Sequence, residues 1–185
     1  MKVLALSGSL RAASINSALL RAAARLAPPE VSVTVFTGLG DLPLFNPDLD
    51  ASYPEPVASL FFQVAQADAL LIASPEYAHG VTGTIKNTLD WLVGFEPFAN
   101  KPVAVLNASP RAYHADAALR ETLRTMAAVL IEPASVTLPL LGAKLDEDGM
   151  VSSPGVAAAI REALVALYDA VVLHKLASNA SFPIR

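Results

Sequence analysis

Short apolar runs alternate along the chain with longer segments in which apolar residues recur every third or fourth position. A fully apolar run of about four to eight residues is typical of a buried parallel strand, and the longer spacing is typical of an amphipathic helix. The predicted strands are residues 3–6, 31–35, 69–73, 103–107 and 134–138, and the predicted helices are residues 15–26, 56–66, 84–93, 115–130 and 154–176. Between them, residues 38–54 form a long irregular segment with three prolines.

This alternation predicts an α/β fold with a doubly wound parallel sheet, in which right-handed crossovers place helices on both faces. Five strands favour the flavodoxin-like order 2-1-3-4-5. The 185 residues are enough for one continuous core, so we expect a single domain over residues 1–185. In such a sheet a ligand binds beyond the carboxyl ends of the first and third strands, where the strand order reverses. The rule points to residues 7–16 and 74–83.

The first of these loops reads SGSLRAASIN. It lacks the spaced glycines of a dinucleotide fold and the Lys-Ser or Lys-Thr of a nucleoside triphosphatase. A helix amino terminus favours an anion, and Ser9, Arg11, Ser14 and Asn16 supply further donors. One phosphate fits better than a pyrophosphate, which needs glycines for close backbone approach. The alternative is that Ser14 only caps the helix while Arg11 is solvated.

The second loop reads SPEYAHGVTG and faces the first across the expected crevice. Pro75 preorganises a turn and Tyr77 offers a ring for stacking on a flat heterocycle, unless that ring packs on the next helix. Glu76 does not suit an apolar crevice, so we expect it to face a helix amino terminus or brace a loop. His79 is interpreted as an exposed imidazole.

A third loop, NASPRAYH, follows the fourth predicted strand. Ser109 and the loop amides are placed to reach the edge of a ring. Arg111 is placed to meet an anionic group such as a cofactor phosphate, or else is solvated. The three loops together predict a site for a ligand that carries both a ring and a phosphate.

Composition narrows the function classes. The apolar fraction of 54% and the charged fraction of 16% favour strands covered on both faces or a surface covered by a second subunit. A net charge of −4 without a basic cluster argues against nucleic acid. The absence of cysteine excludes disulfides, thiolate metal sites and cysteine nucleophiles. With no secretory leader pattern and no apolar run of about 20 residues, we expect a cytoplasmic protein without a membrane span.

Side-chain catalysis and metal chemistry find little support. The chain has no Gly-x-Ser-x-Gly elbow, and its acidic residues and histidines lack the spacing of a hydrolase triad. The three histidines are far apart and have no partners at ligand-like spacing. We therefore predict neither a catalytic side chain nor a metal site.

The stretches GSLRAASINSALLRAA and SPEYAHGVTGTIKNTLDWL together resemble the two motifs of the NADPH-dependent FMN reductase family, which includes flavin, quinone, azo and chromate reductases. The resemblance covers most of the chain, including LPLFNPDLD. It implies FMN as the cofactor, with its phosphate at Ser9, Arg11, Ser14 and Asn16 and with Ser17 as a weaker neighbour. It further implies flavin contacts from Pro75, Glu76, Tyr77, the backbone of Ala78, and Ser109. Lys86, Asn87, Asp90 and Trp91 match scaffold and dimer-face positions.

Two departures from the family pattern concern the electron acceptor. Ala78 stands where the family has asparagine, and the third loop lacks the family's frequent Gly-Gly pair. The resemblance implies that NADPH or NADH reduces bound FMN, which then reduces a flavin, quinone, azo or similar small molecule in ping-pong order. It also implies a homodimer or homotetramer. The alternatives are a non-enzymatic FMN electron carrier of the flavodoxin type and an interaction protein that has lost its flavin.

Overall fold

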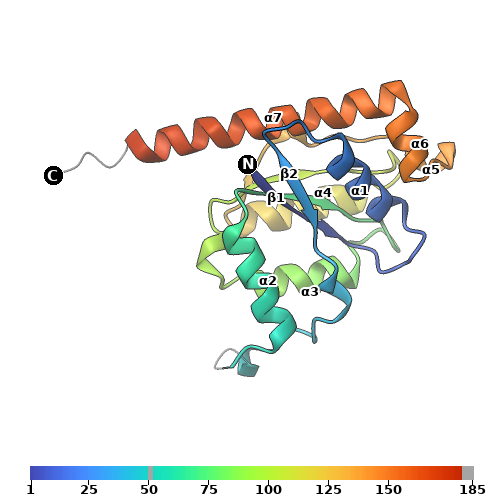
Figure 1. The fold of residues 1–185 in the computed structure, drawn as a ribbon. Coiled ribbons are helices and arrows are strands. Elements are labelled where there is room, and N and C mark those ends of the chain that lie inside the picture. The colour runs from blue at the N-terminus through green and yellow to red at the C-terminus, as the bar shows by residue number, and fades with distance from the viewer. Residues whose placement is uncertain (50–51, 181–185) are drawn as a thin grey trace.

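A computed structural model describes residues 1–49 and 52–180 of the chain. A five-stranded parallel sheet with the order β2-β1-β3-β4-β5 forms its centre (Figure 1). The strands are β1 Lys2–Ser7, β2 Ser32–Val35, β3 Ala69–Ala73, β4 Pro102–Val105 and β5 Val129–Leu130. The helices are α1 Ile15–Leu26, α2 Glu55–Gln66, α3 Gly83–Leu92, α4 Tyr113–Thr125, α5 Leu140–Ala143, α6 Glu147–Ser152 and α7 Pro154–Ala180. The predicted flavodoxin-like strand order is confirmed.

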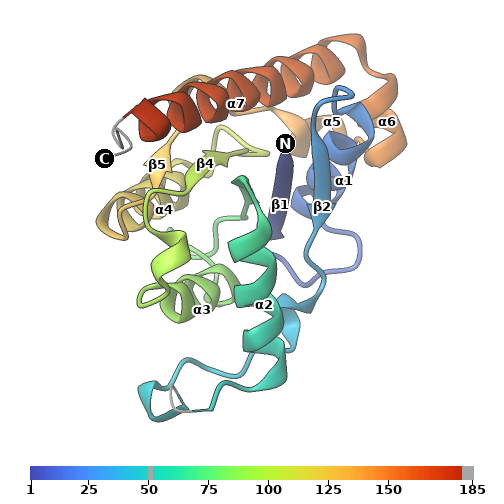
Figure 2. The ribbon, with the colours of Figure 1, turned by 60° about the vertical axis from the view of Figure 1, so that its left-hand side comes forward.

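Helices cover both faces of the sheet (Figure 2). Alternate residues of each strand point to opposite faces, so Val3 and Ala5 pack with α1 and α7, whereas Leu4 and Leu6 pack with α2, α3 and α4. Both sets are nearly inaccessible to water. This explains why the central strands are apolar at every position rather than at every second one.

The loops that follow β1 and β3 approach each other at the carboxyl ends of these two strands, where the strand order reverses. Gly8 donates its N–H to the carbonyl of Ala73 over 2.8 Å and accepts a 2.7 Å hydrogen bond from Thr82 Oγ1. A Cβ added to Gly8 would collide with the side chain of Ser74. Glycine is therefore required here by the close approach of the two loops that follow these strands.

The prediction of the fifth strand is wrong in position. The strand lies at Val129–Leu130 rather than at residues 134–138, because α4 ends at Thr125 and Ala127 turns the chain in a left-handed conformation with φ of 60°. The segment around Thr137 rejoins the sheet only through an isolated bridge to Asn107. Between the two, a short 3-10 turn at Glu132–Ala134 moves the chain out of the ladder.

The segment between the predicted strand at residues 134–138 and the predicted helix at residues 154–176 contains two short helices. α5 and α6 fill residues 140–152, and the side chain of Asp146 caps α6 by accepting from Gly149 N at 2.8 Å. α7 starts as predicted at Pro154 and continues to Ala180, so it crosses the top of the molecule and projects beyond the sheet (Figure 1). The consequence for the site is that α6 lies beside α1.

Candidate functional site

A cavity of about 970 Å³ opens at the carboxyl ends of the strands. Its volume is in the range of pockets that hold cofactors. The cavity is lined by the β1–α1 loop (residues 8–14) and the adjoining turns of α1, by the β3–α3 loop (residues 74–82), by the β4–α4 loop (residues 106–112), and by α5, α6 and the link between them. This is the position predicted from the topology of the sheet.

The β1–α1 loop is held by its own serines. Ser14 caps α1 with its Oγ, which accepts from Ser17 N at 3.3 Å. The hydroxyls of Ser17 and Ser7 are 2.7 Å apart, and Ser9 Oγ accepts from Arg11 N at 3.4 Å. These bonds fix the loop before any ligand is present, so the first-turn N–H groups of α1 keep a constant direction toward the cavity.

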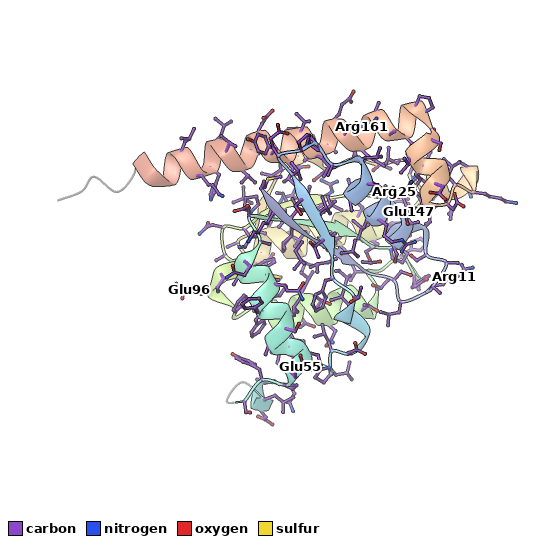
Figure 3. All side chains as sticks on the ribbon, viewed as in Figure 1. Arg11, Arg25, Glu55, Glu96, Glu147 and Arg161 are labelled. Atoms are coloured by element: carbon purple, nitrogen blue, oxygen red, sulfur yellow. The ribbon has the colours of Figure 1, made fainter. Side chains whose placement is uncertain are left out.

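Two side chains at this loop have unused hydrogen-bonding capacity. The guanidinium of Arg11 has no partner among residues 1–49 and 52–180, and it projects outward beside the cavity (Figure 3). Asn16 is only 4% exposed, lines the cavity, and has no partner for its Oδ1 in the described chain. The Oδ1 atom accepts hydrogen bonds, so it fits a ligand that offers a donor such as a hydroxyl, whereas the Arg11 guanidinium fits an anionic group such as a phosphate; a phosphate ester of a polyol carries both.

The β3–α3 loop turns back on itself within four residues. Tyr77 and Gly80 exchange two backbone hydrogen bonds of 3.2 and 2.9 Å, and the two residues between them are both left-handed, with φ of 49° at Ala78 and 60° at His79. Such a turn prefers asparagine and glycine at these two positions. The Tyr77 ring is 61% exposed, so it is free to cover a ligand at the cavity mouth.

Glu76 connects the second loop to the third. Its Oε2 accepts a 2.8 Å hydrogen bond from Ala115 N in the first turn of α4. The expectation that Glu76 faces a helix amino terminus is therefore confirmed. The rings of His79 and His114 lie 4.3 Å apart across the same gap, so two contacts join these loops.

The β4–α4 loop is braced through the backbone. Asn107 Oδ1 accepts from Ser109 N at 3.0 Å, and Ser109 Oγ accepts from Arg111 N at 3.2 Å. Ser109 and Arg111 both line the cavity. The guanidinium of Arg111, like that of Arg11, has no partner in the part of the chain that the structure describes.

Ion pairs join α1 to α6, and these two helices form the remaining wall of the cavity (Figure 3). Glu147 accepts from Arg21 at 2.7 Å and from Arg25 at 3.1 Å, and Arg25 also reaches Asp148 at 2.6 Å. The hydrogen bond from Arg21, together with that from Arg25, holds the pKa of Glu147 below its usual value. The hydrogen bonds that Arg25 donates to Asp148 and Glu147 raise the pKa of Arg25. These arginines are thus largely neutralised.

The cavity brings together most of the predicted site residues. Those that line it are Ser9, Arg11, Ser14, Asn16, Pro75, Glu76, Tyr77 and Ser109. Ser17 and Ala78 are outside this lining and act within their own loops. The α1–α6 wall was not predicted. Its signal in the sequence is the spacing of Arg21 and Arg25 by four residues opposite the acidic run that contains Glu147.

The described part of the chain offers neither a cluster of metal ligands nor a membrane-spanning helix. Within residues 1–49 and 52–180, no three side chains of His, Cys, Asp or Glu gather as a group able to hold a metal ion. None of the helices in these same ranges combines the length and apolar character needed to cross a membrane.

Comparisons with known proteins agree with this geometry. The family model of NADPH-dependent FMN reductases matches residues 1–142. An NAD(P)H-dependent FMN reductase of Pseudomonas aeruginosa is 41% identical over 129 residues, which span 66% of this chain and 69% of that protein. A quinone reductase of Escherichia coli is 35% identical over 113 residues, and the match spans 59% of this chain and 60% of that protein.

A solved structure extends the similarity to most of the chain. FerB, a flavoenzyme NAD(P)H:acceptor oxidoreductase from Paracoccus denitrificans, superposes with a TM-score of 0.83 at 30% identity, covering 94% of this chain and 98% of that one. The fold, the cavity at the strand-order reversal and the family match over residues 1–142 lead to one assignment. The chain belongs to the NADPH-dependent FMN reductase family of oxidoreductases.

Proposed function

We propose that the chain is a single-domain cytoplasmic enzyme that binds FMN in this cavity and uses NADPH or NADH to reduce a small-molecule acceptor of the quinone class. One observation carries the proposal. The unpaired Arg11 and the buried, unsatisfied Asn16 meet at the amino terminus of α1 in a cavity that also reaches the β3–α3 and β4–α4 loops. A ligand with a phosphate and a flat ring suits this cavity, with the phosphate at the amino terminus of α1 and the ring between the β3–α3 and β4–α4 loops.

The residues divide into two groups by what they offer the cofactor. The phosphate is assigned to the hydroxyls of Ser9 and Ser14, the amide of Asn16, the guanidinium of Arg11 and the first-turn N–H groups of α1. Ser17 supports this group indirectly, since its hydroxyl is engaged with Ser7 at 2.7 Å. The donors converge from one short loop, so the phosphate anchors the cofactor in one orientation.

The ribityl chain and the ring are assigned to the other two loops. Pro75, Glu76 and Tyr77 provide backbone groups and one exposed ring, and Ser109 provides a hydroxyl from the far side. Ala78 keeps the turn that presents Tyr77 rather than making a side-chain contact. The tie between Glu76 and α4 holds the two loops at a fixed separation around the ring.

The protein's part in the reaction is to bind and orient. When bound, FMN would supply the redox chemistry, namely hydride acceptance from the nicotinamide and electron transfer to the acceptor, in ping-pong order. The β3–α3 loop would hold the ring, and backbone N–H groups of the loop would stabilise the negative charge that develops on it. No side chain is assigned as a catalytic acid or base.

Quinones are the proposed acceptors because relatives of this chain carry that name. Matches include the E. coli quinone reductase at 35% identity and a 2-hydroxy-1,4-benzoquinone reductase of Burkholderia at 39% identity over 112 residues. The test is a steady-state assay of the FMN-loaded protein with NADPH or NADH and 1,4-benzoquinone. Parallel lines in double-reciprocal plots are expected. Intersecting lines would contradict the ping-pong order, and absence of nicotinamide oxidation would overturn the function.

An exposed apolar surface supports a homodimer or homotetramer. Asn87 and Trp91 hold residues 43–45 against α3. Trp91 Nε1 donates to Pro43 O at 2.9 Å, and Phe45 N donates to Asn87 Oδ1 at 2.8 Å. This leaves Leu44 83% exposed beside Phe45. Apolar side chains presented on a fixed segment are typical of an interface. Sedimentation equilibrium at micromolar concentration is expected to give the mass of a dimer or tetramer.

A further inference from the structure

More cationic side chains line the cavity than one cofactor phosphate needs, although four carboxylates line it as well. Its cationic side chains are Arg11, Arg21, Arg25, Arg111 and Lys144. Arg21 and Arg25 are paired with the carboxylates of α6, and Arg11 is assigned to the FMN phosphate under the proposed function. Lys144 lies next to the acidic run 146–148, which repels a dianion. Arg111 is therefore the cation left to account for.

Arg111 is presented by a rigid support. Its N–H donates to Ser109 Oγ at 3.2 Å, and Ala112 N donates to Ser109 O at 3.0 Å, so both sides of the residue are fixed. The guanidinium itself is exposed, lines the cavity and has no partner among residues 1–49 and 52–180. The backbone is thus fixed, and the unpaired guanidinium is available to bind an anion with two parallel hydrogen bonds.

The loop around Arg111 favours one kind of anion. It contains no glycine between Asn107 and Ala112, and Pro110 removes one N–H group. A pyrophosphate needs close backbone approach, which this sequence does not permit. A terminal phosphate monoester is different, because one arginine side chain can bind two of its oxygens at once. The amino terminus of α4 follows directly, but the Glu76 carboxylate already accepts from its first turn, so the recognition of an anion here depends on the Arg111 side chain.

We propose that Arg111 binds the 2′-phosphate of NADPH and makes the enzyme prefer NADPH to NADH. The inference rests on the proposed function for the presence of a nicotinamide substrate. NADPH differs from NADH only by this phosphate monoester, which carries a charge of about −1.5 to −2 at neutral pH. Arg111 is thus a specificity-determining residue that lies on the opposite loop from the arginine assigned to FMN.

The experiment compares FMN-loaded wild type with Arg111→Ala in two kinds of measurement. With 1,4-benzoquinone as acceptor, kcat/KM for NADPH is expected to fall about tenfold or more through KM, while kcat/KM for NADH changes less than about twofold. In calorimetric titrations, 2′,5′-ADP is expected to bind about tenfold more weakly and 5′-ADP unchanged. The dissociation constant of FMN is expected to be unaffected.

Two further variants serve as controls. Arg161→Ala removes an equal charge from α7, away from the cavity (Figure 3), and is expected to change neither nucleotide. Arg111→Lys keeps the charge without the planar fork, and about half or less of the preference for NADPH is expected to remain. An equal loss of affinity for both ADP isomers in Arg111→Ala would indicate a contact with the 5′-phosphate that both carry, and would overturn the inference. No loss of affinity for either isomer would overturn it too.

The failure of the inference is distinguishable from the failure of the proposed function. If wild type oxidises neither nicotinamide, the function is wrong. The titration with 2′,5′-ADP still decides the inference in that case, because it requires no turnover. A wild type that binds 2′,5′-ADP no better than 5′-ADP would overturn the inference even if both nicotinamides are oxidised.

Discussion

The β1–α1 and β3–α3 loops lie at the same edge of the sheet but keep their shape by different means. The β1–α1 loop is fixed by hydroxyl groups, such as the Ser14 cap and the 2.7 Å contact between Ser7 and Ser17. The β3–α3 loop is fixed by backbone bonds between Tyr77 and Gly80, at the expense of two left-handed residues. A loop held by side chains can leave its helix N–H groups free for an anion. A loop held by its backbone instead presents a ring and a turn.

The largest effect is expected from removing the donors of the β1–α1 loop. Arg11→Ala combined with Ser14→Ala should raise the dissociation constant of FMN at least about 100-fold, because two hydrogen bonds to a charged phosphate are lost at about 1.5–3 kcal/mol each. Titration of the apoprotein with FMN by flavin fluorescence measures it. Arg25→Ala is the comparison, since that arginine is already neutralised, and a change below about threefold is expected. An equal rise in the dissociation constant of FMN for both variants would show that the phosphate does not bind at Arg11 and Ser14.

The next effect concerns the tie between the β3–α3 loop and α4. Glu76→Ala removes the acceptor of Ala115 N and should lower the free energy of unfolding by about 1 kcal/mol, as the loss of a helix cap does. Urea denaturation of the FMN-free protein measures the change. Glu76→Gln keeps an acceptor oxygen and should lose about half as much or less. A loss in Glu76→Gln as large as in Glu76→Ala would mean that charge, not the hydrogen bond, matters.

A smaller effect of opposite sign tests the strained turn. Ala78→Asn should raise the free energy of unfolding by about 0.5 kcal/mol, because asparagine tolerates the left-handed conformation better than alanine. Ala12→Asn in the β1–α1 loop is the matched control, since Ala12 is exposed and has no positive φ. No gain in Ala78→Asn relative to this control would contradict the interpretation of the turn as strained.

The smallest effect tests the neutralised arginines beside the β1–α1 loop. Glu147→Gln should lower the free energy of unfolding at pH 7 by about 0.5 kcal/mol or less, since the pairs are partly exposed. The folded state depresses the pKa of Glu147, so the contribution is complete above its unfolded value and disappears as the pH falls through the folded one. Wild type and variant should therefore differ fully above the usual glutamate pKa of about 4.3 and converge only in more acidic solution, below the depressed folded pKa. A difference that persists in acid would contradict this assignment.

Much of the fold follows from the hydrophobic pattern, and the failures have local causes. The strand order and the helices on both faces come from the alternation of apolar runs with amphipathic segments. The fifth strand was misplaced because alanine, not glycine, takes the left-handed turn at residue 127. Without that stop signal, the helical period of the sequence continues through residues 129 and 130, and the later apolar run at 134–138 is the more typical strand.

The site was predictable where the topology alone determines it. The β1–α1, β3–α3 and β4–α4 loops follow parallel strands, so their residues had to gather at one edge, and most of the predicted set lines one cavity. The α1–α6 wall was not predictable in this way. Its position depends on where α5 and α6 pack, and both are too short to leave a periodic pattern. Only their charges, opposite to those of Arg21 and Arg25, pointed to the contact.

The family match ends at residue 142, yet the cavity continues to Asp148. One pocket is therefore built from two stretches of chain with different constraints. The loops of the first stretch must keep their backbone geometry, because Gly8 leaves no space between them. The wall made by α5 and α6 is attached by the buried side chains of Leu140 and Met150, and at the surface by ion pairs to Arg21 and Arg25. Substitutions in that wall can change the width of the cavity mouth while the flavin loops stay as they are, which makes residues 140–152 the place to begin retuning this scaffold for bulkier substrates.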